Sequence, residues 1–372
     1  MRSHSAFVVM AAALLGAVSA GAADDTQAVL ERFLVQEQAA PVRDTPLWRK
    51  PRKVLLLDYG LHRNGEDRLR AVLGDAELVV VHDTRSAIPA AADVDVIIGA
   101  NPEICDARII ESARNLRWLA SLSAGVDECM DLPEATRARF MMTNMRGIDS
   151  PIVAEHAIAL MLALAHGLDR FAVDNSQGRW SMGRRVPVLF LEGKTVLVSG
   201  LGAIGTEIAK RAHGLGMKVV ATRVGGTGKP DFVEYVGQPE ELLKLARTAD
   251  VVISAVPLTA ETTDLYNAEF FAVLKPTAFF INIARGGSVD TDALVAALNA
   301  GKLGGAGLDV TDPEPLPAGH PLWKAPRVLI TPHIAGRSDF PDDARWVIAT
   351  ENLRRYVAGG KMLNRVDLQR GF

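Results

Sequence analysis

Short apolar runs rich in Val, Ile and Leu recur along most of the 372-residue chain, and polar segments compatible with helices separate them. Four such runs lie within residues 53–122, and six lie within residues 194–333. Continuous apolar runs that alternate with helices indicate parallel sheets covered on both faces. The pattern therefore predicts an α/β fold with two doubly wound parallel-sheet domains.

The composition excludes some classes of protein. Hydrophobic residues make up 48% of the chain and charged residues 23%, which is typical of a globular protein with a sizeable core. A net charge of −3 argues against a nucleic-acid partner. The two cysteines, Cys105 and Cys129, are too few for a disulfide framework, and we expect two separate thiols, although an exported chain could pair them. No spacing of Cys and His suggests a metal site.

The N-terminus has the pattern of an export signal. Arg2 precedes an apolar stretch, and no charged residue follows it before Asp24. Two triplets that fit the small-x-small pattern of a cleavage site, "VSA" and "AGA", end at Ala20 and Ala22. We expect residues 1–22 to be a cleaved signal peptide, the mature protein to be periplasmic or secreted, and no membrane contact after cleavage. The alternatives are an uncleaved anchor, since the apolar stretch could just span a bilayer, and a cytoplasmic protein.

Two further segments stand apart from the alternating pattern. Residues 23–50 are polar and contain Pro41 and Pro46, and Pro51 follows directly, so we expect a short helix near 28–36 and then a linker. Residues 150–171 begin with Ser150 before Pro151, a pattern typical of a helix start with Ser as N-cap. This segment is apolar on almost all sides, which predicts a helix buried between domains or in a subunit interface.

A glycine-rich turn follows the first apolar run of the second series. Gly200, Gly202 and Gly205 stand directly after a predicted strand and directly before a predicted helix. Such glycines allow a tight turn, close approach of the backbone to a pyrophosphate, and close packing of helix on strand. The helix N-terminus also favours phosphate. We interpret the turn as a dinucleotide site; the alternative is a plain strand-to-helix connection.

The next predicted strand ends at Thr222 and Arg223, without a carboxylate. An NAD site usually has Asp or Glu about 20 residues after the glycines to bind the ribose. An arginine would instead pair with a 2′-phosphate. We therefore expect NADP(H) to be preferred, with NAD(H) possible, and Lys229 to add a weaker contact. The alternative is that Arg223 is a solvated loop residue.

Four polar residues lie at or just beyond the ends of later apolar runs: Arg285, Asp309, Glu314 and His333. Ligands of open α/β sheets bind outside the carboxyl ends of the strands. We therefore expect these side chains to converge near the nicotinamide end of the cofactor. Each of them alone could be structural, as a helix cap, a turn residue or a packed histidine.

Several motifs occur together and in order. They are "SAGVD" (123–127), "VAEHAIALMLAL" (153–164), "GLGAIG" (200–205), "VPLTAET" (256–262), "ARGGSVD" (284–290), "LDVTDPEPLP" (308–317), "TPHIAG" (331–336) and "NRVD" (364–367). With these motifs, the chain resembles the D-isomer-specific 2-hydroxyacid dehydrogenases of the glyoxylate/hydroxypyruvate reductase kind. The resemblance covers about residues 53–367.

The resemblance implies roles for individual residues. Arg285 holds the substrate carboxylate and polarises its 2-oxo group, His333 is the proton donor and acceptor, and Glu314 orients His333. Ala124 and Gly125 complete the carboxylate site with their backbone amides. The cofactor-binding positions are Gly200, Gly202, Ala203, Ile204, Gly205, Thr222, Arg223, Val256, Pro257, Thr262, Ile283, Ala284, Arg285, Asp309 and His333. Glu155 and His156 are interpreted as helix-packing residues near the hinge.

The resemblance also implies the domain organisation. Residues 51–149 and 337–372 form a split, flavodoxin-like substrate domain, and residues 150–336 form the Rossmann domain that binds NAD(P). The segment 150–171 resembles the dimer element of the family, which implies a homodimer.

The implied activity is the reversible reduction of a small 2-oxo acid, such as glyoxylate, hydroxypyruvate or pyruvate, to the D-2-hydroxy acid with NADPH. One alternative is a dinucleotide-sensing binding protein of the same fold. Another is a formate- or phosphite-type dehydrogenase, although formate enzymes of this fold typically place glutamine where Glu314 stands.

Overall fold

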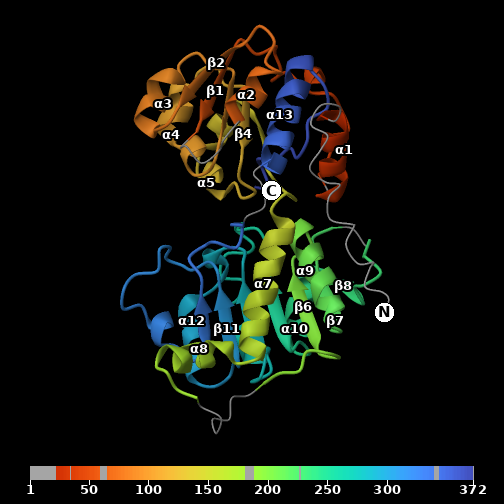
Figure 1. Cartoon of the computed structure of the whole chain (residues 1–372), viewed down its shortest axis with the longest axis vertical. Coiled ribbons are helices and arrows are strands. Elements are labelled where there is room, and N and C mark those ends of the chain that lie inside the picture. The colour runs from red at the N-terminus through yellow and green to blue at the C-terminus, as the bar shows by residue number, and fades with distance from the viewer. Residues whose placement is uncertain are drawn as a thin grey trace, which may run out of the picture.

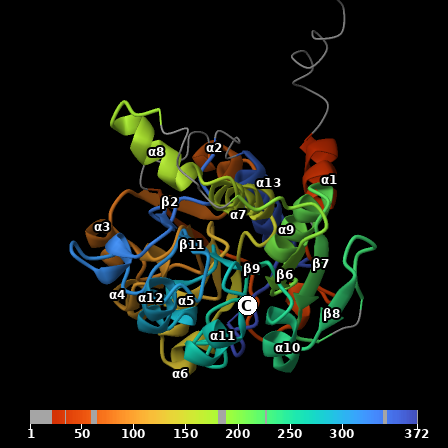
Figure 2. The same cartoon turned by 90° about the horizontal axis from the view of Figure 1, so that it is seen from below.

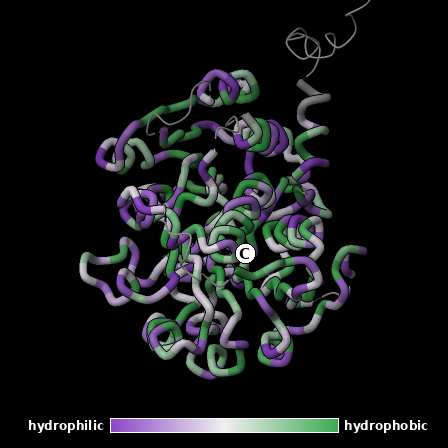
Figure 3. Tube along the Cα trace, turned by 60° about the horizontal axis from the view of Figure 1, so that its bottom comes forward, coloured by the Kyte–Doolittle hydropathy of each residue, from purple (hydrophilic) through white to green (hydrophobic). Residues whose placement is uncertain are grey.

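The computed structural model of the chain describes residues 22–33, 35–58, 65–180, 188–225, 228–338 and 343–371. The chain forms two lobes, each built on one parallel sheet (Figure 1). The predicted α/β class with two parallel-sheet domains is therefore confirmed. The predicted export signal lies outside the described residues, apart from Ala22. Along the described chain hydrophobic and hydrophilic stretches alternate (Figure 3).

The sheet of the first lobe has five parallel strands in the order β2-β1-β3-β4-β5. Its strands are β1 (Lys53–Leu57), β2 (Glu77–Val81), β3 (Val96–Gly99), β4 (Trp118–Ser121) and β5 (Met141–Thr143). The covering helices are α2 (Gly65–Arg70), α3 (Thr84–Ala90), α4 (Ala107–Ser112), α5 (Asp127–Met130), α6 (Glu134–Arg137) and α13 (Asp343–Ala358). This 2-1-3-4-5 order is that of the flavodoxin-like fold. Two core clusters, one on each face, bury the apolar side chains of the strands.

The segment before β1 packs onto the first lobe instead of forming a loose linker. Helix α1 (Ala22–Arg32) lies beside α13 (Figure 1), so the expected helix begins earlier than predicted. The following residues pair with the C-terminal segment, since Val42 N donates to Gly360 O (2.7 Å) and Trp48 Nε1 donates to Tyr356 O (2.8 Å). Val42 is buried in the same core as the strands. Residues 35–50 thus belong structurally to the first lobe.

The sheet of the second lobe has seven parallel strands in the order β12-β11-β10-β9-β6-β7-β8. Its strands are β6 (Thr195–Ser199), β7 (Lys218–Thr222), β8 (Tyr235–Gly237), β9 (Val251–Ser254), β10 (Phe279–Asn282), β11 (Gly305–Leu308) and β12 (Val328–Ile330). Its helices include α9 (Ala203–Gly214), α10 (Leu242–Ala246), α11 (Ala268–Val273) and α12 (Thr291–Asn299). The sequence pattern missed β5 and β8, two three-residue strands that, unlike β12, do not lie in an uninterrupted run of Val, Ile and Leu.

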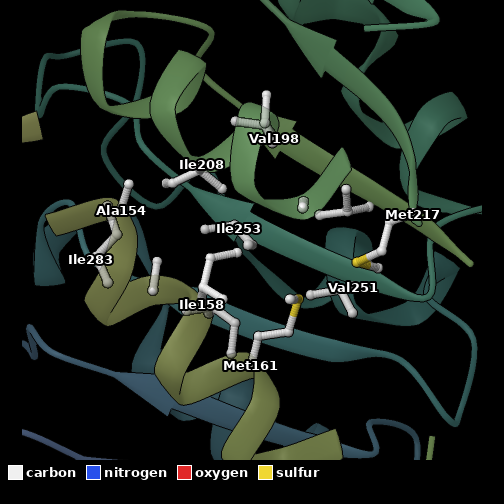
Figure 4. Packing of buried hydrophobic residues seen from close by; sticks show 14 of the residues in the cluster. Ala154, Ile158, Met161, Val198, Ile208, Met217, Val251, Ile253 and Ile283 are labelled. Atoms are coloured by element: carbon white, nitrogen blue, oxygen red, sulfur yellow. The ribbon is translucent and has the colours of Figure 1, made fainter. Parts of the chain in front are cut away.

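Helix α7 (Ser150–Ala165) is the central helix of the second lobe. Its Ala154, Ile158 and Met161 pack against β9 and α9 (Figure 4), which explains why it is apolar on most sides. The prediction of one continuous helix over 150–171 was wrong. Gly167 adopts φ 69°, the left-handed conformation that glycine tolerates, and α8 (Leu168–Ser176) leaves α7 at 75°. The N-cap is Asp149, and not Ser150 as predicted.

Among the described residues, no single helix combines the length and the hydropathy that a membrane span requires. The bent pair of α7 and α8 meets these criteria only when the two helices are taken together.

The two cysteines are joined in a disulfide, so the expectation of separate thiols was wrong. Their Cα atoms are 4.9 Å apart, which is within the usual range for a disulfide. Cys105 ends the 3₁₀ helix η2 (Glu103–Cys105) after β3, and Cys129 lies in α5 after β4. Since β3 and β4 are parallel neighbours in the sheet, the segments that follow them lie side by side at the carboxyl end of the sheet.

Candidate active site

The three glycines of the turn after β6 have different surroundings. Gly200 has φ 99°, and a Cβ at this position would lie 2.7 Å from the carbonyl oxygen of Ala255. A Cβ at Gly205 would lie 2.0 Å from the carbonyl oxygen of Gly200, so α9 could not pack this closely on β6. A Cβ at Gly202 would meet nothing within 4 Å. Gly200 and Gly205 thus shape the turn, while the open space at Gly202, with Ala203 and Ile204 at the start of α9, fits a pyrophosphate.

The end of β7 offers positive charge. Thr222 is buried and accepts backbone hydrogen bonds from Gly200 and Leu201, while Arg223 is exposed and donates to Gly228 O at 3.3 Å. Arg146, in the loop between β5 and α7, interacts electrostatically with Arg223. Burial lowers the pKa of Arg146, and the charge of Arg223 lowers it further. In the part of the chain that the structure describes, neither guanidinium has a carboxylate partner.

Lys229, expected to add a contact beside Arg223, is bound elsewhere. Its Nζ donates to Val233 O at 2.6 Å. A contact with a phosphate would require it to give up this hydrogen bond.

His333 and Glu314 form a hydrogen-bonded pair. The distance from His333 Nδ1 to Glu314 Oε1 is 2.6 Å, and both side chains are about half exposed. The backbone of His333 has φ 52°, a left-handed conformation that costs free energy in a residue other than glycine. Its N–H donates to Asp309 O at 2.8 Å, which helps to hold this conformation. Because Nδ1 is bound to Glu314, Nε2 is the ring nitrogen that remains for a ligand.

Asp309 is buried and anchors the loop that carries His333. Its carboxylate accepts hydrogen bonds from the backbone N–H groups of Ile334 (3.0 Å) and Ala335 (2.9 Å) and from Thr331 Oγ1 (2.6 Å). The hydroxyl of Thr331 in turn lies 2.8 Å from His156 Nε2. Since the hydroxyl proton is directed to Asp309, His156 is the donor in this contact. The predicted contact of Asp309 with the nicotinamide stays a prediction.

Arg285 and the loop at residues 123–125 come from different domains and meet between them. A Cβ at Gly125 would lie 1.7 Å from Arg285 Nη2, so only glycine allows this approach. The carbonyl of Gly125 accepts from Asn101 Nδ2, and that of Ala124 accepts from Asn144 Nδ2, each at 2.7 Å. Among the described residues, neither Ala124 N–H nor Gly125 N–H donates a hydrogen bond. These donors suit a carboxylate.

The remaining predicted cofactor positions follow neighbouring strands of the same sheet. Val256 and Pro257 follow β9, and Ile283 and Ala284 follow β10. Thr262 folds back onto this segment, since its Oγ1 donates to Pro257 O at 2.6 Å. All of these residues lie beyond the carboxyl ends of the strands, and the glycine turn lies on the same side of the sheet. The described residues contain no cluster of His, Cys, Asp and Glu that could hold a metal ion.

Comparison with known proteins agrees with this arrangement. Residues 158–335 match the family model of the D-isomer specific 2-hydroxyacid dehydrogenase NAD binding domain. The glyoxylate reductase of Thermofilum pendens is 33% identical over 291 residues, which are 76% of this chain and 86% of that protein. The chain belongs to the D-isomer-specific 2-hydroxyacid dehydrogenase family. It is thus an NAD(P)-dependent dehydrogenase with a Rossmann domain.

Other members of the family are similarly close to this dehydrogenase. The glyoxylate reductase of Pyrococcus furiosus is 36% identical over 282 residues, 72% of this chain and 80% of that protein. A D-isomer specific 2-hydroxyacid dehydrogenase of Xanthobacter autotrophicus, solved in complex with NADPH and MES, has a TM-score of 0.72 and 28% identity. The match covers 87% of this chain and all of that one.

Three residues of this dehydrogenase that the sequence did not single out as site residues lie at the site. Asp127 Oδ2 is 2.5 Å from Arg285 Nε, Arg146 lies near Arg223, and His156 joins the Thr331 and Asp309 network instead of only packing. Asp127 is the last residue of the motif "SAGVD". A charged residue next to the carboxylate loop was the signal that could have identified it as a site residue. His156 was also within one of the quoted motifs but was interpreted as a helix-packing residue, whereas Arg146 carried no such signal.

Proposed function

We propose that this dehydrogenase reduces a small 2-oxo acid of the glyoxylate, hydroxypyruvate or pyruvate type to the D-2-hydroxy acid, reversibly. Support comes mainly from the hydrogen bond between His333 and Glu314, which leaves one ring nitrogen for a substrate oxygen. The names of the glyoxylate reductases of Thermofilum pendens and Pyrococcus furiosus agree with this substrate class.

In the proposed reaction, each residue has one task. Arg285 and the amides of Ala124 and Gly125 bind the carboxylate, because a guanidinium matches the two oxygens of that group. His333, held at Nδ1 by Glu314, gives its Nε2 proton to the 2-oxo oxygen as hydride reaches the carbon. The bound nicotinamide dinucleotide supplies the hydride. In the reverse direction His333 takes the proton back.

The test is a spectrophotometric panel in which purified protein and NADPH or NADH are mixed with glyoxylate, hydroxypyruvate or pyruvate. We expect NADPH or NADH to be oxidised with at least one of these acids. Binding of the dinucleotide without turnover would instead favour a sensing protein, and turnover only of formate or phosphite with NAD(P)⁺ would favour the other alternative.

We further propose that NADP(H) is preferred over NAD(H). The observations in favour are the exposed Arg223, the absence of a carboxylate partner among the described residues, and the second cation, Arg146, near it. Two like charges placed near each other favour an anion between them, and a 2′-phosphate is such an anion.

Arg223→Asp should reverse the cofactor preference. Hydrogen bonds to charged groups contribute roughly 1.5 to 3 kcal/mol, so the NADPH to NADH ratio of kcat/KM should fall about ten- to a hundredfold or more. The matched control is Arg247→Asp, the same charge change at an exposed position after α10. An unchanged ratio in Arg223→Asp would show that this arginine does not bind the 2′-phosphate.

A homodimer is our proposal for the assembly. Helix α8 lies at the periphery of the molecule (Figure 2) and, with the segments beside it, exposes several large apolar side chains. They are Leu168, Phe171, Val173, Trp180, Val188 and Phe190. Exposed apolar clusters of this kind mark interfaces in soluble proteins, and this one continues directly from the predicted dimer element.

Sedimentation at micromolar concentration should give the mass of a dimer, and the double change Trp180→Ser and Phe190→Ser should shift it toward the monomer. Tyr235→Ser, at an exposed aromatic residue on the edge strand β8, is the control and should leave the mass unchanged. A wild-type protein that sediments as a monomer would contradict the proposal.

A further inference from the structure

The guanidinium of Arg285 is held on two sides by groups of the protein itself. Nε donates to Asp127 Oδ2 at 2.5 Å, and Nη1 donates to the carbonyl oxygen of Ala284 at 2.8 Å. The third nitrogen, Nη2, faces Gly125 of the carboxylate loop. The edge of the guanidinium formed by Nη1 and Nη2 therefore keeps donors for a ligand, and the Nε side does not.

Asp127 and Arg285 are 158 residues apart and belong to different domains. Asp127 begins α5, directly after the loop that contains Ala124 and Gly125. Both side chains of the ion pair are about a quarter exposed, so water screens the pair only in part. The segment is also fixed from the other side, because Cys129 of the same short helix is bonded to Cys105.

The position of Asp127 has an electrostatic consequence. Its carboxylate oxygen would lie 3.3 Å from a Cβ built on Gly125, so it borders the space where the loop amides and Arg285 Nη2 meet. A negative charge here offsets the charge of Arg285 and repels a bound anion. This repulsion doubles when the charge of the anion doubles.

We propose that Asp127 is a positioning residue of this site, which fixes the rotation of Arg285 through Nε and selects small monoanionic substrates over dianionic ones. This inference rests on the proposed function, because it takes the ligand of Arg285 to be the carboxylate of a 2-oxo acid. Asp127 does not touch the substrate. It acts through the orientation of the guanidinium and through its own charge.

Two substitutions separate these two effects. Asp127→Ala removes both the acceptor and the charge, so kcat/KM for the 2-oxo acid should fall about ten- to a hundredfold, as expected for a lost hydrogen bond to a charged group. Asp127→Asn keeps an oxygen that can accept from Nε but removes the charge, so kcat should stay within about threefold of wild type. The affinity for the cofactor should be unchanged in both variants.

The measurement that isolates the charge compares oxamate with oxalate, two anions of nearly equal shape and of charge −1 and −2. Their affinities are determined by fluorescence titration of the full chain with bound NAD(P)H. If Asp127→Asn tightens oxamate about tenfold, it should tighten oxalate about a hundredfold, since the electrostatic energy scales with the charge of the ligand. A merely structural role of Asp127 would change both affinities equally.

Asp149→Asn is the matched control. Asp149 forms an ion pair of 2.7 Å with Arg345 of α13 and lies outside the proposed site, so its loss should leave the oxalate to oxamate ratio unchanged. If wild type turns over a 2-oxo acid but the ratio is the same in wild type and Asp127→Asn, the inference is wrong and the proposed function stands. If wild type neither turns over nor binds these acids, the proposed function is wrong, and the inference with it.

Discussion

Replacement of His333 by alanine should lower kcat by about 100- to 10,000-fold, the usual contribution of a general acid–base group. The physical reason is the loss of the imidazole whose Nδ1 is held by Glu314 and whose Nε2 remains for a substrate oxygen. Binding of the dinucleotide should change little, because the glycine turn after β6 is not altered. Stopped-flow or steady-state assays with NADPH, together with a cofactor titration, measure the two effects separately.

The control for this prediction is His166→Ala, at an exposed histidine after α7 that has no part in the proposed site. It should retain wild-type turnover. A His333→Ala enzyme that turns over as fast as the control would remove His333 from the mechanism.

Arg285→Lys should reduce kcat/KM for the 2-oxo acid by about a hundredfold or more, although the positive charge is kept. Lysine has no planar fork and cannot donate at once to Asp127, to the carbonyl of Ala284 and to a carboxylate. Each lost hydrogen bond to a charged group is worth roughly 1.5 to 3 kcal/mol. KM should rise together with a fall in kcat, because the same side chain binds the carboxylate and polarises the 2-oxo group.

Arg285→Ala with added guanidinium provides a second measurement. Partial recovery of activity would show that the fork itself is needed at this position. If Arg285→Lys were nearly as active as wild type, another residue would have to hold the substrate carboxylate.

Strand ends and local turns could be predicted from the sequence because their signals are local. The glycines after β6 and the polar residues after β10, β11 and β12 stand next to apolar runs that are visible in the chain itself. The hydrogen bond between Glu314 and His333 spans only 19 residues and joins two loops at one sheet edge. Rules about parallel sheets are enough to bring such residues together.

Other parts of the site depend on how distant segments meet. The contact of Asp127 with Arg285 exists only because two domains face each other, and no periodicity in the sequence reports that arrangement. The disulfide could be predicted only by knowing that β3 and β4 are neighbours in the sheet. The break between α7 and α8 was missed because apolar residues continue on both sides of Gly167, whose left-handed conformation is a property of the folded chain.

The pairing of residues 35–50 with the segment after α13 sets an order of assembly during synthesis. The Rossmann lobe is continuous from α7 to β12, so all of its strands have been made before α13 is translated. Most of the other lobe is synthesised before the Rossmann lobe. Val42 and Trp48, however, donate to carbonyl groups of Gly360 and Tyr356, which are synthesised after it. Domains generally fold as units. The lobe that begins the described chain is therefore the second to have all of its segments synthesised, and until then its N-terminal segment lacks the surface it will cover.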